Sequence, residues 1–169
     1  MQSVSYGWWI SGRLHQFNDP DMMEFAKATT NENQSRLISG TVSGTLFLNG
    51  DDLTSSTGQL LALTCMTNAA INAVARMGKT FRPVEGNTGT NATDVLVLHD
   101  GTDWYLAVFN YTASATNKAV DFTRAGIPLR SCDALDLWSG TRSAASGSLS
   151  VSLAAQQAKL FKLISHTAR

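Results

Sequence analysis

The part of the sequence after Pro83 constrains the fold most, because it consists of short β-rich runs separated by turn residues. Pairs such as Asp100-Gly101 and Ser139-Gly140 are typical of the tight turns that join antiparallel strands. Six or more short strands at close spacing predict an antiparallel β-sandwich. The predicted strands span residues 95–99, 104–111, 119–122, 134–138, 149–153 and 159–164.

The part before Pro83 has a different periodicity. Leu37, Ile38 and Val42 recur at helical spacing and predict a helix over 35–43, with 29–31 as a source of caps. Ser56 and Gln59 have the spacing of a capping box before a second helix, and a third is predicted over 69–77. Residues 45–48 form a short apolar run that suits a strand buried on both faces of a parallel sheet.

These two patterns predict an α/β segment followed by an all-β segment. The polar, glycine-rich stretch 85–91 connects them. We therefore divide the chain into residues 1–82 and residues 83–169.

Polar and aromatic side chains gather near the N-terminus, in residues 13–23 and the aromatic residues just before them. Pro20 fixes its own φ and favours an extended backbone at Asp19. A rigid turn of this kind can direct Asp19 and Asp21 at one ligand. The alternative is an Asx-type turn whose carboxylates cap free N–H groups of a following helix.

Two motifs about thirty residues apart resemble a known family of enzymes. Asn18-Asp19-Pro20-Asp21-Met22 and Asn49-Gly50-Asp51-Asp52-Leu53 resemble the late barrel strands of α-galactosidases and α-N-acetylgalactosaminidases, in glycoside hydrolase family 27. Phe81-Arg82-Pro83-Val84 follows as it does in that family, and the strands at 104–111 and 158–163 resemble its C-terminal sandwich.

The resemblance implies that residues 1–82 are a C-terminal fragment of a (β/α)8 TIM barrel, its last β/α units, and that residues 83–169 are an antiparallel β-sandwich. It implies a hydrolase, the C-terminal portion of a retaining glycosidase that acts on terminal α-galactosyl or α-N-acetylgalactosaminyl groups. In that family the nucleophile and the acid/base Asp lie upstream of the first motif. We therefore expect no catalytic residue in this chain, and no activity from it alone.

The resemblance also implies the sugar-binding residues. Asp21 accepts hydrogen bonds from sugar hydroxyls, Met22 lies beside the pocket, and Asp19 shapes the turn. Asp19 and Asp21 are not a catalytic pair, because neighbours on one tight turn approach the sugar from the same side, whereas a retaining enzyme needs two carboxyl groups flanking the bond.

Two further residues are predicted to contact the sugar. Trp8 and Trp9 alternate in direction along a strand, so one of them, for which we take Trp9, can stack on a sugar face. Arg13 and His15 share a face, and Arg13 is a candidate for substrate binding. Salt-bridge and capping roles are alternatives for both residues.

The remaining acidic residues have simpler explanations. A metal site formed by His15, Asp19, Asp21, Asp51 and Asp52 has a spacing that matches no known ligand motif, so no metal and no cofactor are predicted. Asp51 and Asp52 also fit a glycine turn followed by a helix cap. A second function class stays open, a non-catalytic carbohydrate-binding or structural β-sandwich module.

Composition limits the partners. Lys+Arg and Asp+Glu both number 13, which favours neither nucleic acid nor an anionic membrane, so the expected partner is a carbohydrate substrate. Charged residues make up 15% of the chain, and this low share indicates surface that another part or copy covers. Residues 46–48 are expected near an unpaired edge, so the chain can self-associate through the incomplete barrel.

The sequence does not specify the localisation. No apolar run is long enough to span a bilayer, and a secreted or periplasmic parent protein follows only from the resemblance. Cys65 and Cys132 lack metal-ligand spacing and are predicted to be buried free thiols. Asn91 and Asn110 begin glycosylation sequons.

Overall fold

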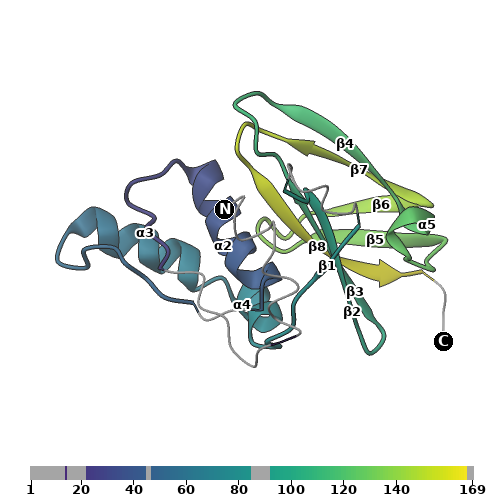
Figure 1. Cartoon of the computed structure of the whole chain (residues 1–169), viewed down its shortest axis with the longest axis horizontal. Helices are drawn as coiled ribbons and strands as arrows, with labels where there is room; N and C mark the ends of the chain where they lie inside the picture. The colour runs from purple at the N-terminus through teal and green to yellow at the C-terminus, as the bar shows by residue number, and fades with distance from the viewer. Residues whose placement is uncertain (1–13, 15–21, 45–46, 85–91, 167–169) are drawn as a thin grey trace.

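The computed structural model describes residue 14 and residues 22–44, 47–84 and 92–166. The longer helices lie on one side of the molecule, and the two sheets lie on the other together with a short helix of four residues (Figure 1). The helices are α2 (Thr30–Val42), α3 (Ser56–Met66), α4 (Ala69–Ala75) and the short α5 (Phe122–Ala125). None of them is long and apolar enough to cross a membrane.

The β-strands form two antiparallel sheets, which confirms the predicted antiparallel sandwich. The larger sheet has the strand order β1-β2-β3-β8-β5-β6, and the smaller one pairs β4 with β7. The strands are β1 (Arg82–Pro83), β2 (Val95–Asp100), β3 (Asp103–Phe109), β4 (Thr116–Asp121), β5 (Ser131–Asp136), β6 (Arg142–Ser146), β7 (Ser148–Leu153) and β8 (Ala158–Ser165).

The strand predictions differ from the structure at a few places. β6 was not predicted, because Arg-Ser-Ala-Ala-Ser contains no β-branched or aromatic residue, and it forms through its pairing with β5. Phe122 was assigned to a strand but begins α5, since the Asp121 side chain accepts a hydrogen bond from the Arg124 N–H and caps this turn. Both predicted hairpin turns are present, and Gly101 and Gly140 have positive φ values of 61° and 74°.

Two hydrophobic cores lie on the two faces of the large sheet. The core between the sheets contains alternating side chains such as Leu149, Val151 and Leu153 of β7. The core on the other face lies between the large sheet and the helices. Because the large sheet is covered on both sides, β2 has four consecutive buried residues, Val95 to Leu98, instead of an alternating pattern.

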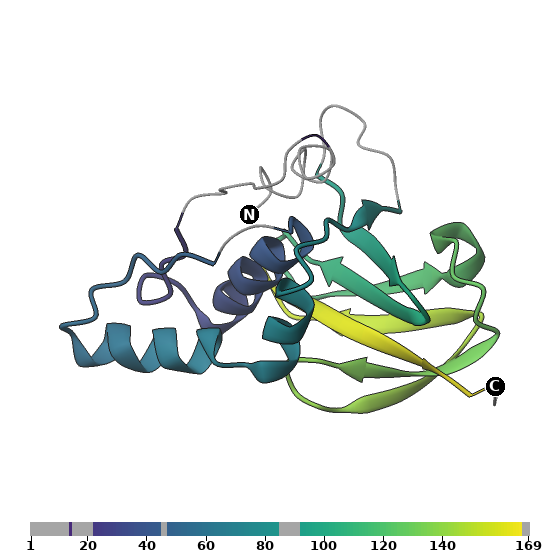
Figure 2. The same ribbon diagram turned by 90° about the horizontal axis from the view of Figure 1, so that it is seen from below.

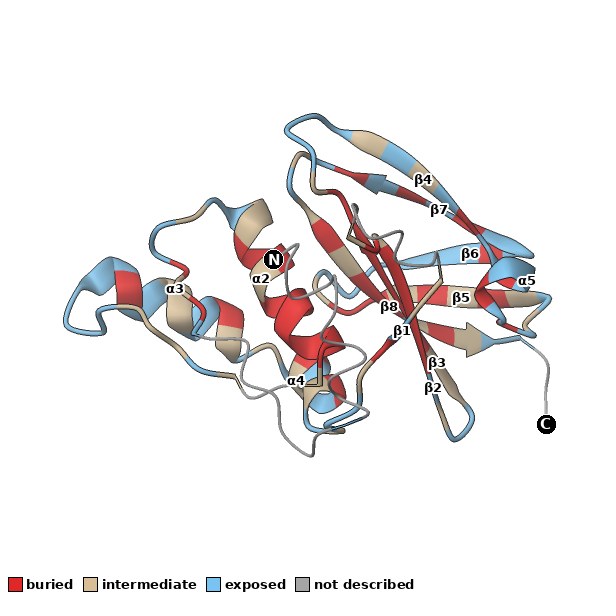
Figure 3. Ribbon diagram, viewed as in Figure 1, coloured by how far each residue is buried: buried red, intermediate tan, exposed pale blue. Residues whose placement is uncertain are grey.

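Helix α2 is the element that joins the helices to the sheet. Leu37, Ile38 and Val42 are buried in the same core as Leu98 and Ala107 of the large sheet. Figure 3 shows α2 as buried along most of its length. The helix begins earlier than predicted, because Thr29 and Glu32 form a complete capping box and allow Thr30 and Asn31 into the first turn.

The capping box predicted for α3 from Ser56 and Gln59 does not form, and the N-cap is the preceding residue, Ser55. The Ser55 side chain, not that of Ser56, accepts the N–H of Gly58 at 3.0 Å. Gln59 instead donates from its side chain to the Leu53 carbonyl at 2.8 Å. The Gln59 side chain therefore ties the first turn of the helix to the segment that precedes it.

The turn between β7 and β8, residues 154–157, is where α2 meets the sandwich. The Ser35 hydroxyl donates to the Gln156 carbonyl at 2.7 Å, and the Asn31 amide donates to the Ala155 carbonyl at 3.2 Å. From the sandwich side, the Asn110 amide nitrogen donates to the Ala154 carbonyl at 2.7 Å and to the Ser114 carbonyl at 2.8 Å. The nitrogen that would carry a glycan is thus occupied and buried, so Asn110 is a structural residue.

We expect Asn110→Ala to lower the free energy of unfolding by about 2–3 kcal/mol, because it removes a buried side chain that donates to the Ser114 and Ala154 carbonyls and accepts from the N–H and hydroxyl of Thr112. Urea denaturation followed by circular dichroism measures this value. Asn117→Ala is the control, since Asn117 is exposed on β4, and it should cost less than about 0.5 kcal/mol. Equal losses for the two variants would contradict the structural role of Asn110.

Candidate functional site

A parallel β-bridge between Met23 and Asn49 brings the ends of the two family-like motifs together. The Met23 N–H donates to the Leu48 carbonyl at 2.8 Å, and the Gly50 N–H donates to the Met23 carbonyl at 2.9 Å. The strand predicted at 45–48 is only partly described, and residues 47–48 adopt no regular strand. The parallel pairing is present, as a single bridge.

Helix α2 supports this bridge from one side. An added Cβ on Gly40 would lie 3.2 Å from Cε1 of Phe47 and 3.3 Å from the terminal methyl of Met23. The glycine therefore lets both side chains pack directly against the helix. The bridge is held by tertiary packing and not by a long strand ladder.

Asp51 fastens the two segments to each other. Its carboxylate accepts the N–H groups of Phe25 and Ala26 at 2.9 and 2.8 Å, and the Asn49 side-chain amide at 2.8 Å. Partial burial opposes ionisation of Asp51. The two backbone N–H groups, the Asn49 amide and the charge of Arg36 outweigh it and hold the pKa of the carboxyl below its usual value.

Asp52 has a local role in the turn before α3. Its carboxylate accepts the Thr54 N–H at 2.9 Å and the Thr54 hydroxyl at 2.6 Å. Its carbonyl accepts the Ser55 N–H at 3.2 Å. Both acidic residues of the second motif thus shape the backbone. The turn expected at Asp52 is present, whereas the residue that caps α3 is Ser55 and not Asp52.

Met22 is the only one of the four predicted sugar-binding residues that lies within the described part of the chain. Its side chain is 56% exposed and covers Gly50, where an added Cβ would lie 2.1 Å from its sulfur. Only glycine fits at position 50 with Met22 in this place. Asp21, Trp9 and Arg13, together with Asp19 and His15, lie outside the described residues, and their roles stay predictions.

Other candidate chemistry in the described residues is sparse. No group of three or more His, Cys, Asp and Glu side chains within residues 22–44, 47–84 and 92–166 is placed to hold a metal ion. Cys65 and Cys132 are buried and free, as predicted. Burial, with a smaller effect of the Asp51 charge, raises the pKa of the Cys65 thiol to about 11, and burial also raises the pKa of Cys132. Neither thiol is a nucleophile at neutral pH.

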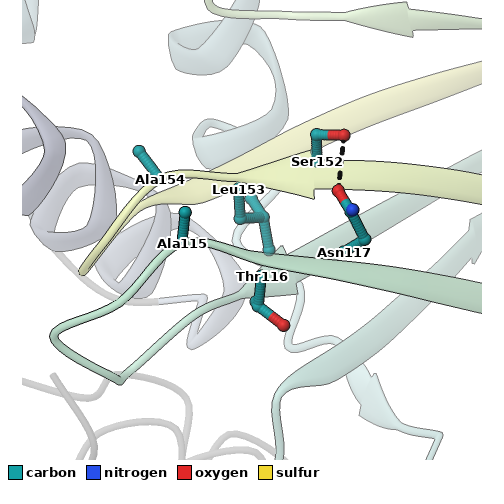
Figure 4. Close-up of a pocket in the computed structure, with 6 residues that line it drawn as sticks. All are labelled: Ala115, Thr116, Asn117, Ser152, Leu153 and Ala154. Atoms are coloured by element: carbon teal, nitrogen blue, oxygen red, sulfur yellow. Dashed lines mark hydrogen bonds between the residues drawn. The ribbon is translucent and has the colours of Figure 1, made fainter.

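A shallow hollow of about 510 Å³ lies at one end of the β4–β7 sheet (Figure 4). Its lining has small side chains, and the Ser152 hydroxyl in it donates to the Asn117 side-chain oxygen at 2.7 Å. It holds neither an aromatic ring nor a charged group, so we exclude it as a catalytic site. The lining residues are Ala115, Thr116, Asn117, Ser152, Leu153 and Ala154.

A family model described as the α-galactosidase C-terminal β-sandwich domain matches residues 93–163. Residues 93–163 of this chain are thus similar to the C-terminal β-sandwich domain of the α-galactosidases. The matched region runs from before β2 to within β8, so it includes the small sheet and all of the large sheet except β1 and the end of β8. Comparison with curated protein sequences gave no match.

Solved structures extend the likeness beyond the sandwich. A family 27 β-L-arabinopyranosidase from Geobacillus stearothermophilus superposes with a TM-score of 0.74 at 15% identity, covering 100% of this chain and 43% of that one. α-Galactosidase I from Mortierella vinacea gives 0.68 at 17% identity, covering 90% and 41%. A putative α-N-acetylgalactosaminidase from Bacillus halodurans gives 0.71 at 14% identity, covering 98% and 45%.

These likenesses establish the fold. The helices and the sandwich together have the arrangement of the C-terminal part of family 27 glycoside hydrolases, as the sequence motifs predicted. The chain spans less than half the length of each of these three structures.

We expect Asp51→Asn to lower the free energy of unfolding by about 1–3 kcal/mol, because one amide oxygen cannot accept from all three donors. Asp52→Asn is a matched control that should change little, since both Thr54 donors meet a single oxygen of Asp52. Chemical denaturation at neutral pH distinguishes them. Equal effects would contradict the role of Asp51 in joining the two segments.

The stabilisation by Asp51 should depend on pH. Because its folded-state pKa is lowered, its contribution is fully present above the unfolded pKa of about 3.9 and is lost as the pH falls through the folded value. The stability difference between the wild type and Asp51→Asn should therefore shrink on acidification below about pH 4. Denaturation curves from about pH 7 to pH 3 measure it, and a difference that grows with acid would contradict this sign.

Proposed function

We propose that the chain is the C-terminal portion of a retaining glycoside hydrolase that acts on terminal α-galactosyl or α-N-acetylgalactosaminyl groups. In this proposal the chain contributes residues of the sugar pocket but neither of the two catalytic carboxylates. The observation that carries the proposal is the parallel bridge, because it sets Met22 of one motif beside Gly50 of the other. Active sites on parallel β/α barrels lie at the carboxyl ends of the strands, where such segments meet.

Met22 gives the proposal a partial structural basis. A methionine with 56% of its surface exposed next to a pair of strand ends is available for contact with a ligand. Asp21 directly precedes it and is the proposed acceptor for sugar hydroxyls. Trp9 is proposed to stack on the sugar and Arg13 to contact its polar groups.

The two acidic residues of the second motif do not favour catalysis by this chain. The Asp51 and Asp52 carboxylates are engaged by backbone donors and by Asn49 or Thr54. A retaining mechanism requires two carboxyl groups about 5–5.5 Å apart that flank the scissile bond. In the proposed enzyme both are supplied by residues outside this sequence.

We also propose the division of the chain at residues 82 and 83 and self-association through the first unit. The helical core and the core between the sheets lie on opposite faces of the large sheet, which supports two units. The exposed large apolar side chains of the described residues lie before Pro83, which supports association through the first unit.

We expect this chain alone to show no hydrolysis of an aryl α-galactoside above a buffer blank. A discontinuous assay at high protein concentration measures the release of the aryl group. Turnover that Asp21→Asn abolishes would contradict the assignment of the catalytic carboxylates to residues outside the chain. Binding of galactose without turnover, in contrast, agrees with either a pocket fragment or a carbohydrate-binding module.

The role of Asp21 separates these two alternatives. In a polypeptide that joins this sequence to the catalytic part of the enzyme, Asp21→Ala should reduce kcat/KM by a factor equivalent to about 1–3 kcal/mol or more, because it leaves buried polar partners unpaired. Asp19→Ala is the control and should act mainly on the melting temperature. An Asp21→Ala variant with lower melting temperature and unchanged kcat/KM would contradict the pocket assignment.

A further inference from the structure

The segment directly after Met22 and its bridged neighbour Met23 has an irregular backbone. Residues 24–26, hereafter the 24–26 segment, belong to no helix or strand. The N–H and carbonyl groups of such a segment cannot be satisfied by a regular ladder and need other partners. Here those partners are side chains from α2 and Asp51. The path of the chain beside Met22 is therefore set by groups distant in sequence.

Helix α2 binds the carbonyl groups of the 24–26 segment. The Arg36 guanidinium donates to the Glu24 carbonyl, and the Asn33 side-chain amide donates to the Phe25 carbonyl at 3.0 Å. Arg36 and Asn33 are three residues apart and therefore neighbours on one side of the helix. Figures 1 and 2 both show α2 between α3 and the sheets. The donors thus extend from a helix whose own position is fixed by the sandwich.

Asp51 binds the N–H groups of the same segment. Its carboxylate accepts from Phe25 and Ala26 at 2.9 and 2.8 Å. The Asn49 amide, which donates to Asp51 at 2.8 Å, belongs to the residue that is bridged to Met23. A positively charged side chain therefore holds a carbonyl group of the segment, and a negatively charged one holds its N–H groups.

These charged contacts add direction to the apolar packing of the segment. The Phe25 side chain is fully buried in the helical core and sets the depth of the segment. Apolar burial has no directional preference, whereas hydrogen bonds to charged groups are directional and about twice as strong as those between neutral groups. Arg36 and Asp51 thus fix the orientation of a backbone whose depth Phe25 sets.

We propose that Arg36 and Asp51 are positioning residues of the sugar pocket, and that they hold the 24–26 segment so that Met22 lies over Gly50. This proposal rests on the proposed function, since it concerns the same pocket. Both residues act through Met22, whose sulfur would lie 2.1 Å from an added Cβ on Gly50. The supporting residues matter to a pocket because a shift of about 1 Å in a contact can change a rate by about 100-fold.

The position of Met22 can be followed in the whole chain by NMR of methionine methyl groups labelled with ¹³C. The signal of Met22 is the one lost in Met22→Leu. We expect Asp51→Asn and Arg36→Gln each to shift or broaden this signal while the amide signals of β3 stay unchanged. The control Lys27→Gln removes an exposed ion pair between Lys27 and Glu24 and should leave the Met22 signal in place.

Arg36→Gln keeps the test decisive if Asp51→Asn disorders the first unit. Arg36 is half-buried, and its replacement removes a single donor to the segment while it preserves a good helix former. A Met22 signal that Arg36→Gln leaves unchanged, in a folded chain, would overturn the positioning role of Arg36. The same result for Asp51→Asn would overturn that of Asp51.

Kinetics distinguish positioning from stability alone. In the polypeptide that joins this sequence to the catalytic part of the enzyme, both variants should raise KM for an aryl α-galactoside and lower kcat/KM by about 10-fold or more. A variant that is only less stable loses active enzyme, which lowers the apparent kcat at unchanged KM. The control Asn110→Ala should lower the melting temperature and leave KM unchanged.

The outcomes separate this proposal from the proposed function. An unchanged KM in Asp51→Asn and Arg36→Gln, with the wild-type polypeptide active, would overturn the positioning role and leave the glycosidase assignment intact. A wild-type polypeptide without turnover would contradict the proposed function. The methyl signal would then still decide whether Arg36 and Asp51 hold Met22 in place.

Discussion

The packing of α2 against the large sheet is the interaction on which the other features of the first unit depend. Leu37, Ile38 and Val42 fill the core on that face of the sheet, and burying each such side chain is worth about 1.5–3 kcal/mol. Polar side chains add direction to this packing. Asn31, Gln34 and Ser35 bond to the turn at residues 155–157, which itself joins β7 of the small sheet to β8 of the large one. The helix is therefore fixed in both position and rotation relative to the sandwich.

The candidate site is built outward from this helix. Gly40 of α2 lets Met23 and Phe47 approach closely, and their position sets the parallel bridge at Asn49. Asp51 then fastens the segment at residues 25–26 to the turn that leads into α3. A single pair of bridged residues has little stability of its own. The geometry that places Met22 next to Gly50 is thus a consequence of the sandwich and α2, and only secondarily of the motif residues.

The sequence predicted the features that depend on local patterns. Asp100-Gly101 specifies a hairpin because glycine takes positive φ at little cost, and the alternating leucines and valine of β7 specify a strand with one buried face. Features that depend on distant partners were less accessible. β6 has a sequence with no strand preference and exists because β5 pairs with it. Asp51 was read as a turn residue, whereas two of its donors lie 25 and 26 residues earlier in the chain.

The site itself was predicted through motif resemblance more than through physics. The resemblance assigned the two motifs to late strands of a parallel barrel, and the parallel bridge between Met23 and Asn49 agrees with it. The Met22–Gly50 contact had a possible signal in the glycine of the second motif, but its partner cannot be read from one segment alone. The assignments of Asp21, Trp9 and Arg13 stay predictions.

Native-state hydrogen exchange tests most directly the claim that the sandwich is the stable unit and supports the first one. The amides of Met23 and Gly50 should exchange through a partial opening at low free energy, whereas those of Leu106–Phe109 in β3 should exchange only on global unfolding. Amides in the centre of α2 should have intermediate to high protection, because this helix is packed on the sheet. Protection of the Met23 and Gly50 amides equal to that of β3 in the monomer would contradict the account, since the first unit would then be stable without depending on the sandwich.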